Sequence, residues 1–543
     1  MRPFPDPKAV VGDASAKLQR GDPAAALAVL RPVAFALAAE SGAGFRDLVE
    51  RLPVELWQHD PLLAAALGHS YRAADAPGGA AGLAYFAAAE DAAAADPATP
   101  AHVVAAVLVS HAGGLRAAGR LEQAREKLSG AEAIIDAGLD GPVPATMELR
   151  ARHALERGLL DLHGGRYTDA RERLLTARGL ASHLSRAGSV ECAGALALLE
   201  FALGDLVAAE RFVDESRELA AGTMLERSGY AAPAIATRLL LDLDREADDA
   251  PADRQALTEA SAHTEWEAYA ALLAGARLAA DGRPTEALDL LAGARRGFRA
   301  WQVAGFGRDL TEIVRASQLA AVGRGDEAWE VLSRLRPGDQ HVVCPGVHLA
   351  AHLLAGGDLH GAARALAACE AVGDIHGTRA LLEARLLRGA IAAALGDRAT
   401  SDVSVDLAFI GMARTGSRSP LRLVPAGLLG SLAERALERE HSDEVRALIE
   451  RARRAADGAQ PAIEPLSIRE RLVLAEAQHG ATVSAIAAAM FISPNTVKTH
   501  LRRVYRKLGV TTREEAIRKA RTLGLHEITR DSPVPRKDDT RGT

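Results

Sequence analysis

The segment 493–508 combines a well-marked helix start with regularly spaced cationic and hydrogen-bonding side chains. Ser493 is a favoured N-cap residue, and Pro494 suits the first turn of a helix. Apolar residues recur with helical spacing and predict one buried stripe, formed by Val497, Leu501, Val504, Tyr505 and Leu508. The other side chains predict a basic outer face, formed by Lys498, Thr499, Arg502, Arg503 and Arg506. Because such side chains bind base edges and phosphates, this helix could lie in the major groove of DNA.

Three further helices are expected around the basic helix. The first ends near Gly480. The second starts at Thr482, and a turn of about four residues separates it from the basic helix, which is helix-turn-helix geometry. We expect this unit to span Thr482 to Leu501. Thr512 and Glu515 have the spacing of a capping box, which predicts the start of a fourth helix.

Residues 464–528 resemble the LuxR-type (NarL/FixJ-like) helix-turn-helix family. Several motifs carry the resemblance at fixed spacing: Leu466-Ser-x-Arg-Glu470, Gly480, Ile486-Ala487, Ser493-Pro-Asn-Thr-Val-Lys-Thr-His-Leu501, Tyr505-Arg-Lys-Leu-Gly-Val510 and Arg513-x-Glu515-Ala516. The resemblance implies that this segment binds double-stranded DNA.

The family's contact residues can be carried over where the motif matches. The resemblance implies base-edge contacts from Lys498, Thr499 and Arg502. It implies phosphate contacts from Ser493, Asn495, Thr496, Arg503 and Lys507. It also implies a homodimer, because the fourth helix often forms the interface in relatives, and paired half-sites add affinity.

The segment departs from the family pattern at two positions. Leu472 and Ala485 stand where relatives usually have acidic residues. An acid at the second position would complete a capping box with Thr482, so its loss should cost about 0.5–1 kcal/mol. Neither position would read DNA, so the departures concern the stability of the domain.

Charge is distributed unevenly along the chain. Residues 464–528 hold 11 Lys/Arg and 6 Asp/Glu, a net charge of +5, and the tail from 529 carries +1. With a total of −6, residues 1–463 carry −12. An acidic body attached to a small basic domain is expected when only one of the two parts meets phosphate.

The composition favours a helical protein of the reducing cytosol. Apolar residues make up 48% of the chain and aromatics only 4%, and alanine is abundant, which favours close helix packing over sheet. The three cysteines (Cys192, Cys344 and Cys369) are few and far apart, so they predict no disulfide framework. The first residues lack the apolar core of a signal peptide, and no uncharged apolar run reaches the roughly 18 residues of a membrane helix. We therefore expect a cytoplasmic protein without a membrane partner.

The first 455 residues contain a repeating pattern. Apolar, alanine-rich stretches alternate with short turns at Gly21-Asp22, Gly78-Gly79, Gly119-Arg120, Gly165-Arg166, Gly204-Asp205, Gly282-Arg283, Gly325-Asp326, Gly357-Asp358 and Gly396-Asp397. Gly165 and Gly204 are 39 residues apart, as are Gly357 and Gly396. A period near 40 with a helix on each side of the turn predicts an α-solenoid. Alanines follow several turns and resemble those of tetratricopeptide repeats: Ala124, Ala170, Ala287 and Ala328. An irregular helical bundle is the alternative.

The expected fold class is all-α: an α-solenoid of helix-turn-helix repeats, then a small four-helix DNA-binding domain. The expected divisions are repeats at 1–455, a linker at 456–464, the LuxR-type domain at 465–528 and a disordered tail at 529–543. This order resembles the large LuxR-type activators related to the maltose-operon regulator, which also carry an NTPase domain.

The NTPase domain of those activators is not expected here. A phosphate-binding loop needs Gly-Lys-Ser/Thr, and none of the seven lysines follows a glycine. A phospho-receiver domain is not expected either, because the N-terminal region reads as helix throughout rather than alternating with strands. We expect no cofactor.

Other side chains could carry chemistry in the repeats. His348 and His352 share a helical face near His341 and Cys344, a spacing that zinc can use. The alternative, histidines packed or solvated at the start of a repeat helix, is favoured, so no metal is expected. Four tryptophans could line a ligand groove but more often fill a core: Trp57, Trp266, Trp301 and Trp329. Cys192 lies in an apolar stretch, which favours an inert thiol over a redox sensor.

These observations predict a sequence-specific, DNA-binding transcription regulator that is not an enzyme. Its helical repeats would act as a sensor or interaction region for a protein or small-molecule effector. Two alternatives remain: a helical-repeat scaffold that has kept a vestigial helix-turn-helix, and a sigma-factor-like promoter module.

Overall fold

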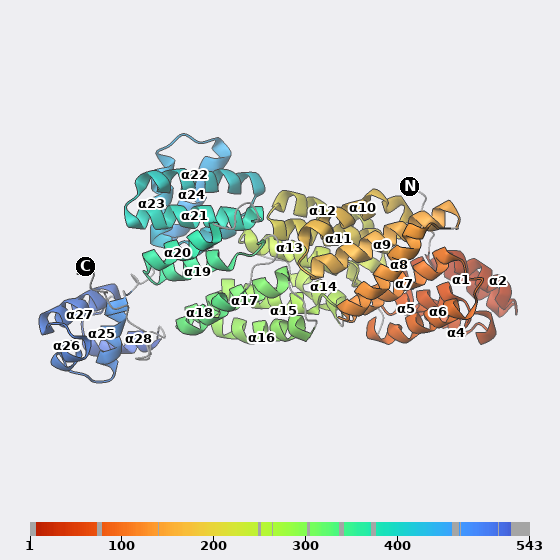
Figure 1. Ribbon diagram of the computed structural model, residues 1–543, viewed down its shortest axis with the longest axis horizontal. Helices are drawn as coiled ribbons and strands as arrows, with labels where there is room; N and C mark the ends of the chain where they lie inside the picture. Colours follow the sequence, from red (N-terminus) through yellow and green to blue (C-terminus); the bar gives the residue numbers. More distant parts are fainter. Residues whose placement is uncertain are drawn as a thin grey trace, which may run out of the picture.

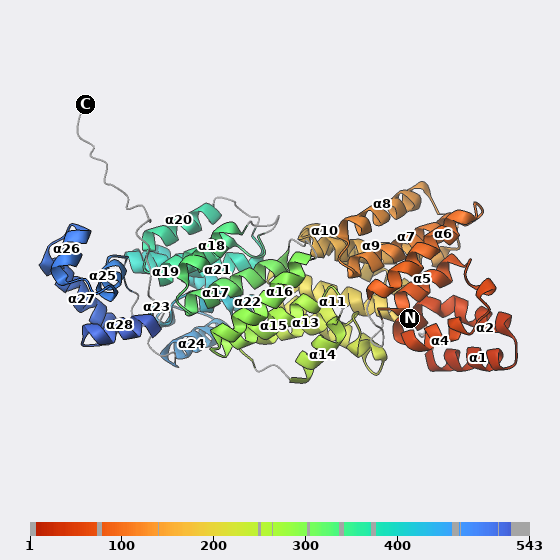
Figure 2. The same ribbon diagram turned by 90° about the horizontal axis from the view of Figure 1, so that it is seen from below.

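The computed structural model describes residues 7–72, 79–139, 141–247, 251–262, 264–300, 305–335, 341–370, 376–458, 466, 468–508 and 510–522. Every regular element within these ranges is a helix. Consecutive helices pack as hairpins that follow one another along an elongated body (Figures 1 and 2). The predicted all-α class and solenoid are confirmed.

Within the described ranges, the helices divide into an N-terminal group, nine hairpins and a terminal group. The N-terminal group comprises α1 (Pro7–Gln19), α2 (Pro23–Leu30), α3 (Ala34–Glu40), α4 (Gly42–Glu50), α5 (Pro61–Ser70) and α6 (Leu83–Ala95). The hairpins pair α7 (Ala101–Ala117) with α8 (Leu121–Ala137), α9 (Val143–His163) with α10 (Tyr167–Gly179), α11 (Arg186–Leu203) with α12 (Leu206–Ala220), α13 (Ala232–Asp244) with α14 (Pro251–Ser261), α15 (Glu267–Ala280) with α16 (Pro284–Ala300), α17 (Phe306–Ala321) with α18 (Gly325–Arg334), α19 (Pro345–Ala355) with α20 (Leu359–Glu370), α21 (Thr378–Leu395) with α22 (Arg398–Thr415), and α23 (Ala426–Leu437) with α24 (Asp443–Gly458). The terminal group comprises α25 (Ile468–Gln478), α26 (Val483–Met490), α27 (Pro494–Leu508) and α28 (Arg513–Thr522). Short 3-10 turns occur at η1 (Arg31–Val33), η2 (Val54–Leu56), η3 (Gly79–Gly82), η4 (Ala181–His183), η5 (Met224–Arg227) and η6 (Ser419–Leu423).

The predicted turns account for most of the hairpins. Gly204 ends α11 with φ +93°, and a Cβ there would lie 2.4 Å from the backbone nitrogen of Arg379, so both conformation and space require glycine. About midway between the predicted turns at Gly204 and Gly282, Glu246 takes a left-handed backbone with φ +56°. One prediction was wrong in detail: the left-handed residue before α18 is Gly323, whereas Gly325 is already helical.

Small residues after the turns let paired helices approach closely. The predicted alanines are fully buried: Ala124, Ala170, Ala287 and Ala328. One continuous core runs from α9 to α18 and a second from α19 to α24. Trp266 lies in the first core, whereas Trp329 is exposed, Trp57 is half-buried and Trp301 lies outside the described residues. Burial raises the pKa of the Cys192 thiol to about 12, which suits an inert side chain.

A buried charged cluster joins several hairpins of the body. Arg116 in α7 donates from Nε to Glu156 Oε2 of α9 (2.9 Å) and from Nη2 to Glu191 Oε1 of α11 (3.1 Å). Its Nη1 also donates to Glu265, just before α15. Arg72, after α5, donates to the same Glu191 oxygen at 2.6 Å. Because these five side chains are buried, the cluster fixes the relative positions of helices far apart in sequence.

One apolar stretch has the length and composition of a membrane span. It covers Pro23–Glu40, near the N-terminus. The structure divides this stretch among α2, η1 and α3. Leu30 and Leu37 within it are buried against the apolar residues of α4 and α5.

The repeat body ends with α24, and the terminal group begins with α25. Helix α24 continues to Gly458, three residues into the predicted linker. The remaining linker residues, and the predicted tail at 529–543, lie outside the described residues. The terminal group α25–α28 lies at the opposite end of the long axis from α1 and α2 (Figures 1 and 2).

Candidate nucleic-acid interface

Helix α27 is held by two small apolar cores of the terminal group. Its first half contributes Val497 and Leu501 to a core with Ile486 of α26. Its second half contributes Val504 and Leu508 to a core with residues of α25 and α28. All four of these α27 side chains are buried, as the predicted stripe requires. The opposite face of α27 is therefore fixed in direction by packing along the whole helix.

The ends of the helix-turn-helix are set by local hydrogen bonds. Thr482 caps α26 by accepting from the backbone nitrogen of Ala485 at 3.2 Å. Ser493 caps α27 by accepting from the backbone nitrogen of Thr496 at 3.1 Å. Between them Phe491 takes a left-handed backbone with φ +54°, so it turns the chain without a glycine. The stretch from Thr482 to Leu501 comprises the cap of α26, α26 itself, the turn and the first half of α27.

Four predicted contact residues lie together on the outer face of α27. Lys498, Thr499, Arg502 and Arg503 are all exposed. Among the described residues, no ion pair neutralises Lys498, Arg502 or Arg503. The Thr499 hydroxyl donates to the Asn495 carbonyl oxygen at 2.9 Å, which leaves the hydroxyl oxygen able to accept from a base edge.

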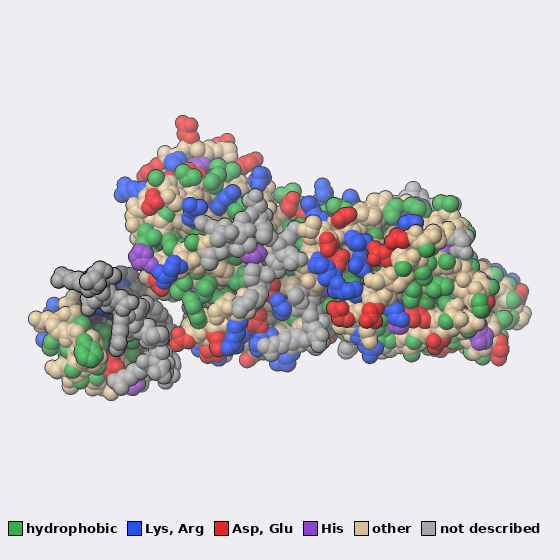
Figure 3. Space-filling model, viewed as in Figure 1, with side chains coloured by type: hydrophobic (Ala, Val, Ile, Leu, Met, Phe, Trp, Pro, Cys, Tyr) green, Lys and Arg blue, Asp and Glu red, His purple; other side chains and the backbone are tan. Residues whose placement is uncertain are grey.

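The surface of the repeat body differs from this face. On the face of the body that Figure 3 shows, Lys/Arg and Asp/Glu side chains are interspersed. Arg178 binds Glu215 with Nε and Nη2, and Arg171 donates to Glu200 at 2.7 Å. Arginine is abundant in both parts, but these body arginines are neutralised by neighbouring carboxylates, whereas Lys498, Arg502 and Arg503 of α27 are exposed.

Apart from Arg503, the predicted phosphate ligands divide into two groups. Ser493 and Asn495 are exposed and Thr496 is half-buried, all at the N-terminus of α27, where backbone N–H groups and the helix dipole favour an anion. Lys507 lies apart: its Nζ donates to Glu470 Oε2 of α25 at 2.8 Å. The structure thus gives Lys507 a role inside the domain, and we leave it out of the proposed interface.

The Lys507–Glu470 pair predicts a stability effect. The two side chains are only 12% and 4% exposed. Lys507→Met is expected to lower the stability of the terminal domain by on the order of 2 kcal/mol, because it removes a cation from a buried carboxylate. Thermal unfolding of the domain measures this. An unchanged unfolding temperature together with a clear loss of DNA binding would restore Lys507 as a phosphate ligand.

Sequence reasoning missed two features of this domain. Arg513 of α28 donates from Nη2 to the carbonyl oxygens of Ala477 and Ala481, both at 2.7 Å, and so joins α28 to the end of α25. Phe491 at the turn is 94% exposed although it is a large apolar residue. The predicted cap of α28 is confirmed, because Thr512 accepts from the backbone nitrogen of Glu515 at 3.2 Å.

The N-terminus of α26 has only one half of a capping box, so a substitution there is expected to stabilise the domain. Ala485 is exposed at the third position of the helix, where a glutamate could bind the Thr482 backbone N–H and complete a capping box. Ala485→Glu is therefore expected to stabilise the domain by about 0.5–1 kcal/mol. The matched control is Ala488→Glu, at an exposed position of α26 that cannot reach the cap. Equal unfolding temperatures for the two variants would refute the capping argument.

Comparisons with known proteins agree with this geometry. The family "Bacterial regulatory proteins, luxR family" matches residues 464–520. "Probable transcriptional regulatory protein NarL" of Mycobacterium tuberculosis (strain ATCC 25618 / H37Rv) is 47% identical over 62 residues, 11% of this chain and 29% of that protein. "HTH-type transcriptional regulator MalT" of Serratia proteamaculans (strain 568) is 41% identical over 59 residues, 11% of this chain and 6% of that protein.

These likenesses are confined to the terminal domain. The chain spans less than a third of the length of either relative. Among solved structures, "Crystal structure of APC/C hetero-tetramer Cut9-Hcn1" aligns over 95% of this chain and 96% of that chain, with 14% identity and a TM-score of 0.37. At that TM-score the alignment carries no weight for fold or function. Residues 464–520 of this chain are a helix-turn-helix domain of the bacterial luxR family, which follows a region of helical repeats.

Proposed function

We propose that this protein regulates transcription by binding double-stranded DNA through the outer face of α27. The observation that carries the proposal is the set of exposed cations, Lys498, Arg502 and Arg503, on a helix whose other face is anchored in two cores. A rigid helix with an unneutralised basic face suits insertion into the major groove. We assign the protein no catalytic activity.

The face divides into base-reading and positioning parts. Lys498 and Arg502 are one helical turn apart and are proposed to bind base edges together with Thr499. Arg503 is proposed to bind phosphate, as is the N-terminus of α27 with Ser493, Asn495 and Thr496. Phosphate contacts fix the register of the helix, and base contacts supply the sequence preference.

The remaining parts of the proposal concern assembly and control. A homodimer is proposed because one helix covers only a half-site of the DNA. The regulator is proposed to work in the cytoplasm, where its DNA lies. The helical repeats offer an extended surface for a protein or small-molecule effector, whose binding would bias the terminal domain through the segment after α24. Sedimentation of the protein–DNA complex should show two chains per duplex; one chain per duplex would contradict the dimer.

The experiment that tests the proposed function is selection from a random DNA library. The full chain is incubated with random duplexes, bound molecules are recovered, and several rounds are sequenced. A recurring motif, present as two half-sites, is the expected result. Recovery of random sequences, or the same recovery with a Lys498→Ala/Arg502→Ala double variant, would contradict sequence-specific binding.

A further inference from the structure

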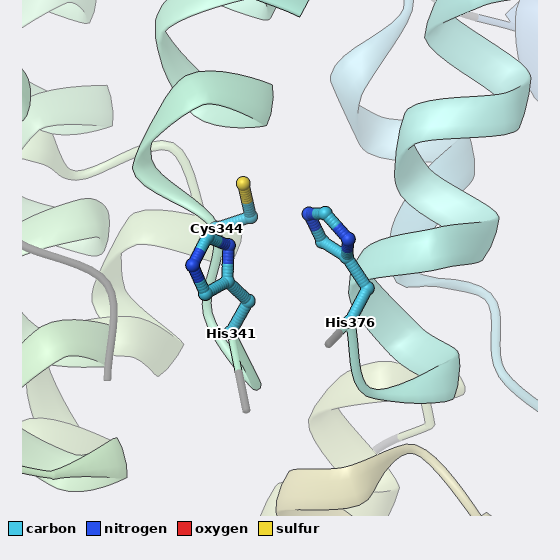
Figure 4. A group of neighbouring side chains, drawn as sticks. All are labelled: His341, Cys344 and His376. Carbon is cyan, nitrogen blue, oxygen red and sulfur yellow. The ribbon is translucent and has the colours of Figure 1, made fainter. Parts of the chain in front are cut away.

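Three metal-ligating side chains meet near the starts of two repeat hairpins. His341 lies just before α19, and Cys344 is the residue directly before that helix. His376 lies just before α21 (Figure 4). Their candidate ligand atoms all lie within 4.8 Å of one another. The two imidazole rings are arranged edge to face, with centroids 4.8 Å apart. Figure 4 shows Cys344 and His376 projecting from separate segments toward a common space.

The backbone holds these two segments together. Cys344 is the N-cap residue of α19, and Pro345 opens that helix. Next to His376, a Cβ added at Gly377 would lie 3.3 Å from the Leu203 carbonyl oxygen and 3.5 Å from Val342 Cα. Glycine thus permits a close approach between the chain before α21 and the chain before α19. The cluster therefore rests on packed backbone as well as on the side chains themselves.

His341 supplies an independent sign of a ligand. His341 is only 7% exposed, and its Nδ1 has no hydrogen-bond partner among the described residues. A buried polar atom without a partner is costly unless something else satisfies it. His341 also has φ +36°, in the sparsely populated left-handed region. Such strain persists where the surrounding structure imposes it, often at functional sites.

We propose that His341, Cys344 and His376 bind a divalent d-block cation, with Zn²⁺ as the preferred ion. Imidazole nitrogen and thiolate sulfur are the ligands that zinc favours, at about 2.0–2.1 and 2.3 Å. Tetrahedral geometry at those bond lengths separates the ligand atoms by about 3.4–3.6 Å, so the side chains must close by about 1 Å. The Cys344 thiol loses its proton on binding, and water fills the fourth position.

This set differs from the one that the sequence suggested. His348, one turn into α19, is half-buried and faces Glu383 of α21, with 3.8 Å between Nε2 and Oε2. Burial lowers the pKa of His348 to about 4, so it is a neutral packed histidine. The third ligand, His376, belongs to another hairpin and could not be found from local spacing. A metal here would join the α19–α20 hairpin to the α21–α22 hairpin.

Cobalt titration of the full chain tests the site. Co²⁺ replaces Zn²⁺ in such sites and gives a thiolate-to-metal charge-transfer band only when sulfur is a ligand. The reduced, chelator-treated chain is expected to bind one equivalent with that band, and added Zn²⁺ should displace it. Cys344→Ser is expected to abolish the band. His376→Gln and His341→Asn are expected to weaken Co²⁺ binding by roughly tenfold or more.

The variants are chosen to keep the fold. Asparagine tolerates the left-handed backbone of residue 341. Cys192→Ser, at a buried thiol of α11 remote from the cluster, is the matched control and should leave the band unchanged. No band from the wild-type chain at saturating Co²⁺ would overturn the proposal, whatever the variants do. So would a band that survives Cys344→Ser, or histidine variants that fold normally by circular dichroism and bind with wild-type affinity.

Discussion

Replacing either Lys498 or Arg502 with alanine is expected to weaken binding to the preferred duplex by about 1–3 kcal/mol, a loss of about 5- to 150-fold. Both side chains are exposed on the anchored helix α27 and have no ion-pair partner among the described residues. Neither variant removes an ion pair or a side-chain hydrogen bond within the part of the chain that the structure describes, so the change should appear in DNA binding and not in stability. Base preference should also relax, because each side chain is proposed to read a base edge.

Arg503→Ala is the matched control for these two variants. Arg503 lies on the same exposed face but is proposed to contact phosphate, so its loss should weaken preferred and scrambled duplexes alike. Fluorescence anisotropy titrations with both duplexes, at several salt concentrations, separate the two kinds of contact. The slope of log affinity against log salt should become shallower by about one for Arg503→Ala. Identical losses on both duplexes for all three variants would contradict the assigned roles.

Arg116→Met is expected to destabilise the repeat body by about 3–5 kcal/mol, because it removes one cation from a buried charged cluster. The Arg116 guanidinium binds Glu156, Glu191 and Glu265, and its loss leaves Arg72 to balance three buried carboxylates. Burial raises the pKa of Glu191, although Arg72 and Arg116 both act to lower it. The two arginines therefore do not fully offset the cost of burying this carboxylate.

Urea unfolding followed by circular dichroism measures this effect. Arg334→Met is the matched control, since Arg334 is highly exposed and forms an ion pair with Glu330 one helical turn away. Such a surface pair contributes about 0.2–1 kcal/mol at most, so the two variants should differ clearly in unfolding midpoint. Equal midpoints for Arg116→Met and Arg334→Met would show that the cluster does not hold the hairpins together.

The fold was largely predictable because its signals are local. Turn glycines, buried alanines such as Ala170, and caps such as Ser493 each act within a few residues, and these predictions were confirmed. The apolar stripe of α27 was predictable for the same reason, because helical periodicity alone selects its buried face. The DNA contacts themselves stay predictions, carried by exposure and charge.

The remaining features depend on contacts between distant segments. Lys507 has the spacing of a surface cation, yet Glu470 lies beside it only because α25 packs against α27. His376 joins His341 only because two hairpins meet. Glu246 takes a left-handed backbone that sequence patterns reserve for glycine. No local pattern contains this information, so such residues become visible only in the folded chain.

The most direct test of the central claim is chemical modification of lysine with and without DNA. The chain has seven lysines, and Lys498 lies on the exposed face of α27, whereas Lys8 is exposed in α1 at the far end of the body. Mass spectrometry follows acetylation of each lysine in the presence of a saturating selected duplex. Lys498 should be strongly protected while Lys8 reacts at an unchanged rate. Equal reactivity of Lys498 in the free and DNA-bound chain would contradict the claim that α27 enters the groove.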